Sequence, residues 1–207
     1  MNYKEKYLKY KRKYLDLKKN HIIKKYISLK DFKGGSKNND SSSDDSSSNT
    51  KPLSINIDVG NVAIRIGYEA DHGETELEFD PSKDLMDGFL ENIAKLKKMG
   101  HILYFNSFCG PEREKKTREI FRKIPEVYNV IPESNWNFVR TRPDKTKVID
   151  ATKADVMIDD RLDICMNMKE HGVKYIFWLT QSGKPSPVGI IKVKNWDEIY
   201  RKIEKIV

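Results

Sequence analysis

The stretch INIDVGNV, residues 55–62, decides the fold. Its apolar residues alternate around Asn56, as in a buried strand, and the pattern stops at Asp58. Gly60 follows two residues later. In open parallel sheets, ligands bind at the carboxyl ends of the strands. A strand that ends in a carboxylate therefore predicts a polar site at that end.

The rest of the chain after residue 52 repeats short apolar runs and helical patterns. Strands that alternate with helices at this length predict a three-layer α/β domain over 53–207, with a parallel sheet covered on both faces. The stretch 63–79 instead alternates on both sides of DHGE, which predicts a β-hairpin directly after Asp58. The expected strands are 53–59, 101–107, 136–139, 154–160 and 174–180, and the expected helices are 84–100, 111–124, 162–172 and 195–207.

The basic residues are concentrated at the N-terminus. The formal net charge is +8, but residues 1–33 carry twelve Lys and Arg against three Asp and Glu. The remainder, with 27 against 28, is nearly neutral. The positive charge therefore says nothing about the partners of the domain itself.

Residues 1–33 predict a basic amphipathic helical arm. Such an arm is compatible with packing on the body or on an acidic partner, with a coiled coil, or with binding to a membrane surface or nucleic acid. Residues 34–52, almost wholly Gly, Ser, Asn and Asp, predict a disordered linker. The apolar stripe of the arm consists of Tyr3, Tyr7, Tyr10, Tyr14 and Leu17.

The cysteine content and hydropathy favour a reducing compartment. Cys109 and Cys165 are the only cysteines and lack CxxC spacing, so neither a disulfide framework nor a zinc site is indicated. No apolar stretch approaches the ~18 residues of a membrane span, and no secretory segment is recognisable. We expect a cytoplasmic protein without a transmembrane segment.

Three predicted strands end in polar residues. Asp58 ends the first, Asn106 and Ser107 the second, and the pair Asp159–Asp160 a later one. In a parallel sheet these strand ends lie side by side at the carboxyl-terminal end of the sheet. Carboxylates clustered there require a cation. Oxygen ligands without a nearby His or Cys favour Mg²⁺. The alternative is that the carboxylates only cap a helix and open a turn.

In this order the motifs resemble those of the haloacid dehalogenase (HAD) superfamily of Mg²⁺-dependent phosphohydrolases. The resemblance implies that Asp58 is the nucleophile that forms an aspartyl-phosphate. It implies that Ser107, or Asn106, binds the phosphoryl group together with a lysine. It also implies that Mg²⁺ is held by the Asp58 side chain, the Gly60 carbonyl, Asp159 and Asp160.

The stretch TRPDKTKVIDATKADVMIDD, residues 141–160, is similar to the TRDKT and IDD motifs of 5'(3')-deoxyribonucleotidases. This likeness indicates Lys145 as the phosphate-binding lysine, with Lys147 and Lys153 as weaker candidates. The arm resembles the N-terminal segments of proteins of giant DNA viruses, which would place the protein in the host cytoplasm or the virion.

Gly60 departs from the HAD pattern. In that family an aspartate at this position gives its carbonyl to Mg²⁺ and its side chain to acid–base catalysis, and a glycine keeps only the carbonyl. The chain also has no room for a large cap, which leaves the site open to large substrates. We expect a phosphatase acting on phosphorylated small molecules, nucleotides or macromolecular phosphoesters. The alternatives are a catalytically impaired binding module and a nucleic-acid-binding protein that uses the arm.

Several further residues have both a functional and a structural interpretation. His72 and Glu74, at the hairpin tip, are either a replacement acid–base or solvated turn residues. Arg140 and Arg142 are expected either to bind a second anion or to form ion pairs on the surface. Trp136 either stacks on a base or packs in the core. We expect Cys109 to be a small buried residue.

Overall fold

The computed structural model describes residues 51–65 and 79–206. The predictions for the arm (1–33) and for nearly all of the linker (34–52) lie outside these residues, as does most of the predicted hairpin with its tip. None of the described helices is long and apolar enough to span a membrane.

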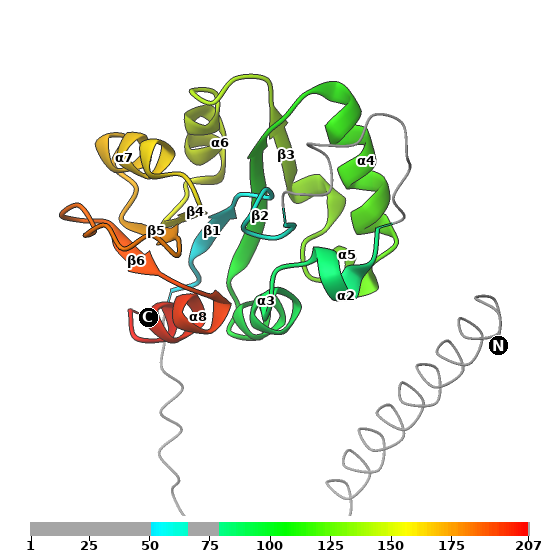
Figure 1. Ribbon diagram of the computed structural model, residues 1–207, viewed down its shortest axis with the longest axis horizontal. Helices are drawn as coiled ribbons and strands as arrows, with labels where there is room; N and C mark the ends of the chain where they lie inside the picture. Colours follow the sequence, from blue (N-terminus) through cyan, green and yellow to red (C-terminus); the bar gives the residue numbers. More distant parts are fainter. Residues whose placement is uncertain (1–50, 66–78, 207) are drawn as a thin grey trace, which may run out of the picture. The chain divides into compact units, whose positions relative to one another are not determined.

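A six-stranded sheet in the order β3-β2-β1-β4-β5-β6 forms the centre of the domain, and all neighbouring strands are parallel (Figure 1). From β1 the chain adds β2 and then β3 on one side. It then crosses back, and β4 pairs with the other side of β1. The strand ends of β1 and β4 therefore flank a topological switch point, where ligands bind in such sheets. The strands are β1 (Ser54–Ile57), β2 (Ile102–Phe108), β3 (Trp136–Val139), β4 (Val156–Asp159), β5 (Tyr175–Leu179) and β6 (Ile191–Val193).

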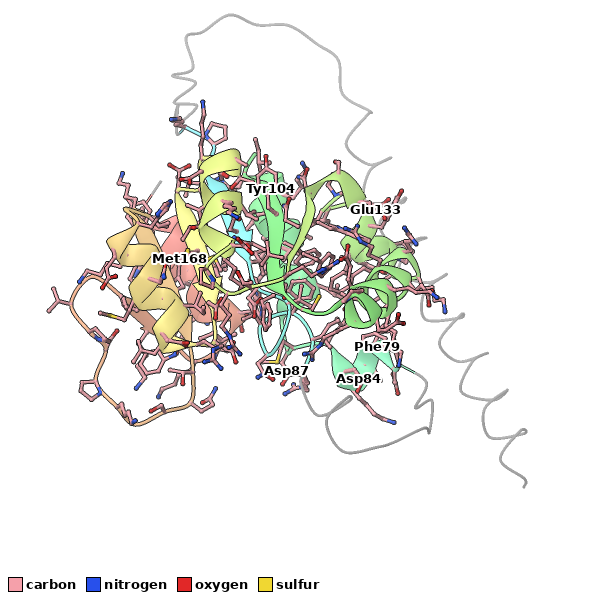
Figure 2. All side chains as sticks on the ribbon, turned by 90° about the horizontal axis from the view of Figure 1, so that it is seen from above. Phe79, Asp84, Asp87, Tyr104, Glu133 and Met168 are labelled. Atoms are coloured by element: carbon pink, nitrogen blue, oxygen red, sulfur yellow. The ribbon has the colours of Figure 1, made fainter. Side chains whose placement is uncertain are left out.

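Helices cover both faces of the sheet, and each face has its own hydrophobic cluster. The larger cluster joins α3, α4, α5 and α8 to residues such as Ile57 and Phe105. The smaller cluster lies under α6 and α7 and includes Met168, which Figure 2 labels. This confirms the predicted three-layer α/β fold. The helices are α2 (Pro81–Asp84), α3 (Phe89–Lys98), α4 (Pro111–Arg122), α5 (Pro125–Tyr128), α6 (Lys145–Thr152), α7 (Leu162–Glu170) and α8 (Trp196–Glu204), with a 3-10 turn η1 (Glu133–Asn135).

The helix expected over 84–100 begins only at Phe89, as α3, and a separate short helix, α2, ends at Asp84 before it. The Asp80 side chain accepts a hydrogen bond from the Ser82 N–H and so caps the short α2, and Leu85 then adopts an extended conformation. Gly88, with φ 75°, begins α3 in a left-handed conformation that favours glycine. The apolar pattern over 84–100 was continuous across this break, so periodicity alone did not indicate it.

Candidate functional site

The predicted polar residues lie together at the carboxyl-terminal ends of the neighbouring strands β2, β1 and β4. Side chains alternate between the two faces of a strand. Ile57 and Ile158 belong to the larger cluster, so Asp58 and Asp159, each one residue further on, lie on the α6 face. The Asp58 N–H donates to the Ile158 carbonyl at 2.9 Å, which continues the pairing of β1 with β4 beyond the last strand residue.

Lys145 connects the two carboxylates. It is the first residue of α6, it is 3 % exposed, and its Nζ lies 2.9 Å from Asp58 Oδ1 and 2.7 Å from Asp159 Oδ2. Burying a lysine is costly unless it is paired and hydrogen-bonded. Two carboxylate partners meet that condition, so α6 delivers a fixed positive charge to the strand ends.

The polar residues of β1 and β2 hold α6 in place. Asn106 is fully buried and donates from its side-chain amide to the Lys145 carbonyl at 3.1 Å. At the other end of α6, Asn56 Nδ2 donates to Thr152 Oγ1 at 2.9 Å, and Ser54 Oγ donates to the Thr152 carbonyl at 2.8 Å. Both ends of the helix are thus fixed to the sheet, which determines where Lys145 points.

The structure separates the alternatives that the sequence left open. Lys147 pairs with Asp144 on the surface at 2.6 Å, with its side chain 81 % exposed. Lys153 is the C-cap of α6, with φ 48°. Ser107 is among the cavity residues, whereas Asn106 contacts the backbone of Lys145.

Three carboxylates form a candidate metal centre. One oxygen from each of Asp58, Asp159 and Asp160 lies within 4.8 Å of the others. Asn61 Nδ2 donates to Asp160 Oδ2 at 3.0 Å, and the Arg161 N–H donates to Asp159 Oδ1 at 2.9 Å. When all three carboxylates are ionised, they and Lys145 together carry two net negative charges, which suits a divalent cation. An all-oxygen donor set fits Mg²⁺.

The electrostatics of the cluster agree with this interpretation. Burial, with the nearby charge of Asp58, raises the pKa of Asp159 to about 7, against the opposing effect of Lys145. Burial also raises the pKa of Asp160. Burial works to lower the pKa of Lys145, but the two carboxylates outweigh it and the pKa is raised. The Lys145 ammonium group is therefore charged. The raised pKa values of Asp159 and Asp160 show that their ionised forms are disfavoured, and a bound cation would stabilise those ionised forms.

A cavity of about 310 Å³ opens over these residues. Its volume is at the lower end of small-molecule sites. Asp58, Gly60, Ser107, Lys145 and Asp160 line it. Sequence reasoning did not consider the other polar and aromatic residues that line it, which include Asn61, Arg65, Phe108, Arg113 and Arg161.

Among the cavity residues that the sequence analysis did not identify, Asn61 is one that the sequence could have indicated. It adopts φ 53°, a left-handed conformation that asparagine tolerates better than most residues, and it links the turn after β1 to Asp160. A Gly-Asn pair directly after a strand predicts such a turn. The arginines carried no comparable signal, because their place in the cavity depends on how separate segments pack.

Arg140, Trp136 and Cys109 take structural positions. Arg140 donates to the Cys109 carbonyl at 3.0 Å and pairs with Glu114 at 2.5 Å. Trp136 is 3 % exposed, and its Nε1 donates to the Ile131 carbonyl at 2.8 Å. Cys109 is 5 % exposed, as a small buried residue would be. His72 and Glu74 lie outside the described residues.

Comparisons with known proteins give a result at the level of structure. No family model matches the sequence, and no curated protein matches it. A HAD-superfamily hydrolase from Ehrlichia chaffeensis superposes with a TM-score of 0.53 at 13 % identity, covering 76 % of this chain and 99 % of that one.

Two D,D-heptose 1,7-bisphosphate phosphatases superpose in the same way. The enzyme from B. bronchiseptica, complexed with magnesium and phosphate, gives a TM-score of 0.55 at 12 % identity, covering 76 % of this chain and 100 % of that one. The enzyme from Burkholderia thailandensis gives 0.50 at 12 % identity, covering 74 % and 99 %. Together with the strand order, these likenesses show that the chain has the α/β fold of HAD-superfamily hydrolases.

Proposed function

We propose that this protein is a Mg²⁺-dependent phosphatase that hydrolyses phosphomonoesters through an aspartyl-phosphate. The observation that carries the proposal is Lys145, buried between Asp58 and Asp159 at the base of the cavity. A purely structural ion pair has no need of a third carboxylate, Asp160, on the cavity wall. A phosphoryl site needs both the lysine and the excess negative charge that holds a cation.

Asp58 is the proposed nucleophile. Lys145 holds its Oδ1, and the carboxylate lines the cavity, so its orientation toward a bound ester is fixed. An oxygen of Asp58 attacks phosphorus, and the bond from phosphorus to the ester oxygen breaks. Water then attacks the aspartyl-phosphate, which releases phosphate and restores the carboxylate. Ser107 and Lys145 bind the phosphoryl oxygens, and Asn106 positions Lys145 through its carbonyl.

Asp58, Asp159 and Asp160, with the Gly60 carbonyl, would hold Mg²⁺. The ion would neutralise the carboxylates and the phosphoryl oxygens. Asn61 and the Arg161 N–H orient two of these carboxylates from outside the cluster.

Gly60 determines which esters this site can cleave. The carboxylates among the described cavity residues are Asp58 and Asp160, both assigned to attack and metal binding. No described side chain is then left to protonate a poor leaving group, a task that contributes about 10²–10⁴ in rate. If neither His72 nor Glu74, which lie outside the described residues, supplies this proton, the proposed enzyme prefers esters whose leaving group departs as a stable anion. A nucleotide, or a phosphate on a macromolecule, is then a slow substrate.

The second candidate is a phosphate-binding module without turnover, which Gly60 favours. It predicts that phosphate or a phosphomonoester binds in the presence of Mg²⁺ but is not hydrolysed. The retained nucleophile and lysine speak for the enzyme.

The test is hydrolysis of 4-nitrophenyl phosphate and of nucleoside monophosphates, with Mg²⁺ and with EDTA. We expect turnover of the aryl ester that requires Mg²⁺ and is lost in Asp58→Asn. Activity that persists in Asp58→Asn would refute Asp58 as the nucleophile. Mg²⁺-dependent binding with no turnover on any substrate would leave the binding module as the function.

A further inference from the structure

Arg142 and Phe108 form a cation–π pair on the wall of the cavity. The guanidinium carbon of Arg142 lies 5.0 Å from the centre of the Phe108 ring, and both residues line the cavity. Phe108 is the last residue of β2 and is 37 % exposed. The ring serves as a platform for the guanidinium, because arginine stacks readily on aromatic faces.

Arg142 differs from neighbouring arginines in its partners. Arg65 pairs with Asp87 at 2.7 Å (Figure 2 labels Asp87), and Arg161 pairs with Asp163 at 2.9 Å. Within residues 51–65 and 79–206 the Arg142 side chain makes no ion pair, and it lies over the ring of Phe108. A guanidinium over an aromatic ring can still bind an oxyanion in a bidentate manner through its N–H groups.

The pair also lies next to the proposed phosphoryl site. Phe108 directly follows Ser107 in β2, and the Lys145 N–H donates to the Arg142 carbonyl at 3.1 Å. Each member of the pair is thus close in the chain to a phosphoryl-binding residue. A substrate bound to Ser107 and Lys145 would extend its leaving group past this wall.

Charge balance indicates what Arg142 would bind. When fully ionised, Asp58, Asp159, Asp160 and Lys145 carry two net negative charges, which one Mg²⁺ would balance. Mg²⁺ and Lys145 already serve the phosphoryl group. A further exposed cation on the cavity wall serves a different part of the substrate.

We propose that Arg142, positioned by Phe108, binds a second anionic group, a carboxylate or a phosphate, on the leaving-group side of the substrate. This inference rests on the proposed phosphatase function and specifies its substrate class. Arg142 is the specificity residue, and Arg140, two positions earlier, is excluded from that role by its pairing with Glu114.

A matched series of aryl esters tests this, since aryl esters need little help from a general acid. The substrates are phenyl phosphate, 3-carboxyphenyl phosphate and 1,3-phenylene bisphosphate. For each, kcat/KM is measured in the wild type, in Arg142→Gln and in Arg201→Gln. Arg201 is an exposed residue of α8, so its substitution removes the same charge outside the cavity.

We expect the wild type and Arg201→Gln to prefer at least one of the two substrates with a second anionic group over phenyl phosphate, on the order of tenfold, as one charge-assisted contact supplies. In Arg142→Gln this ratio should fall close to one. A preference for the carboxylate or for the bisphosphate identifies which oxyanion is recognised. No preference in the wild type, or the same preference in Arg142→Gln, would overturn the inference while leaving the phosphatase intact.

A binding measurement separates this inference from the proposed function. Calorimetric titration of Asp58→Asn with the same three ligands and Mg²⁺ reports affinity without turnover. If no ester is hydrolysed, the phosphatase fails, yet a preference of Asp58→Asn for the second anion that Arg142→Gln abolishes would still support the role of Arg142. Equal affinities for all three ligands would refute it.

Discussion

A carboxyl group placed at position 60 should restore hydrolysis of phosphoesters with poor leaving groups. Gly60 lines the cavity two residues after Asp58 and is partly exposed. It does not adopt a positive φ, so an L-residue can take its backbone conformation. Gly60→Asp therefore adds a carboxyl group two residues after the nucleophile, at a position whose backbone conformation an L-residue can adopt.

The expected size of the effect follows from what the described cavity lacks. A positioned general acid contributes about 10²–10⁴ in rate when the leaving group needs a proton. For an alkyl ester such as glycerol 3-phosphate, Gly60→Asp should therefore raise kcat/KM about 10²-fold or more. For 4-nitrophenyl phosphate the gain should be small, because the nitrophenolate leaves without protonation.

The assay is steady-state release of phosphate from both esters, with Gly60→Asn as the matched control. Asparagine has nearly the same shape but cannot transfer a proton, so it should give no gain on the alkyl ester. Equal gains in the Asp and Asn variants would refute the reasoning. So would a gain in Gly60→Asp that is equal for the alkyl and the aryl ester.

Two predictions concern stability. Lys145→Met should lower the free energy of unfolding by about 3–5 kcal/mol without Mg²⁺, because it leaves Asp58 and Asp159 buried without their cation; urea denaturation measures this, and a loss below about 1 kcal/mol would contradict it. Burial lowers the pKa of His101, whose Nδ1 accepts the Leu53 N–H at 3.2 Å. The unfolded chain then binds a proton near pH 6.5 and the folded protein only at lower pH, so stability should fall as the pH decreases through 6.5. The raised pKa of Asp159 acts in the opposite direction over the same range but is common to both proteins. Melting curves should therefore show that lowering the pH through 6.5 costs the wild type more stability than it costs His101→Gln.

The sequence predicted the elements whose apolar pattern is long or unbroken. The strands β1, β2, β4 and β5 are apolar runs buried on both faces, which is the signature of a central parallel strand. The edge strand β6 has only three residues and went unnoticed. The helix α6 was also missed, because its apolar contacts are few and polar bonds from Asn56 and Asn106 hold it to the sheet.

The candidate site was predictable to the extent that strand ends carry its residues. Asp58, Ser107 and Asp159 could be placed at one edge because parallel strands align their carboxyl ends. The choice of Lys145 over two neighbouring lysines needed a resemblance, since it depends on the first turn of α6. The difference between Arg140 and Arg142 was not predictable, because it arises from packing between α4 and the segment after β3.

The position of β1 in the centre of the sheet has a consequence for biosynthesis. Asp58 meets Lys145 only 87 residues later, and the Ser54 N–H meets Asp155 only 101 residues later. As the chain leaves the ribosome, β2 can pair with β1 early, but the other edge of β1 stays open until β4 emerges. An unpaired apolar edge is a template for aggregation. The nascent protein therefore passes through a long interval in which it can neither assemble its charged cluster nor protect its central strand.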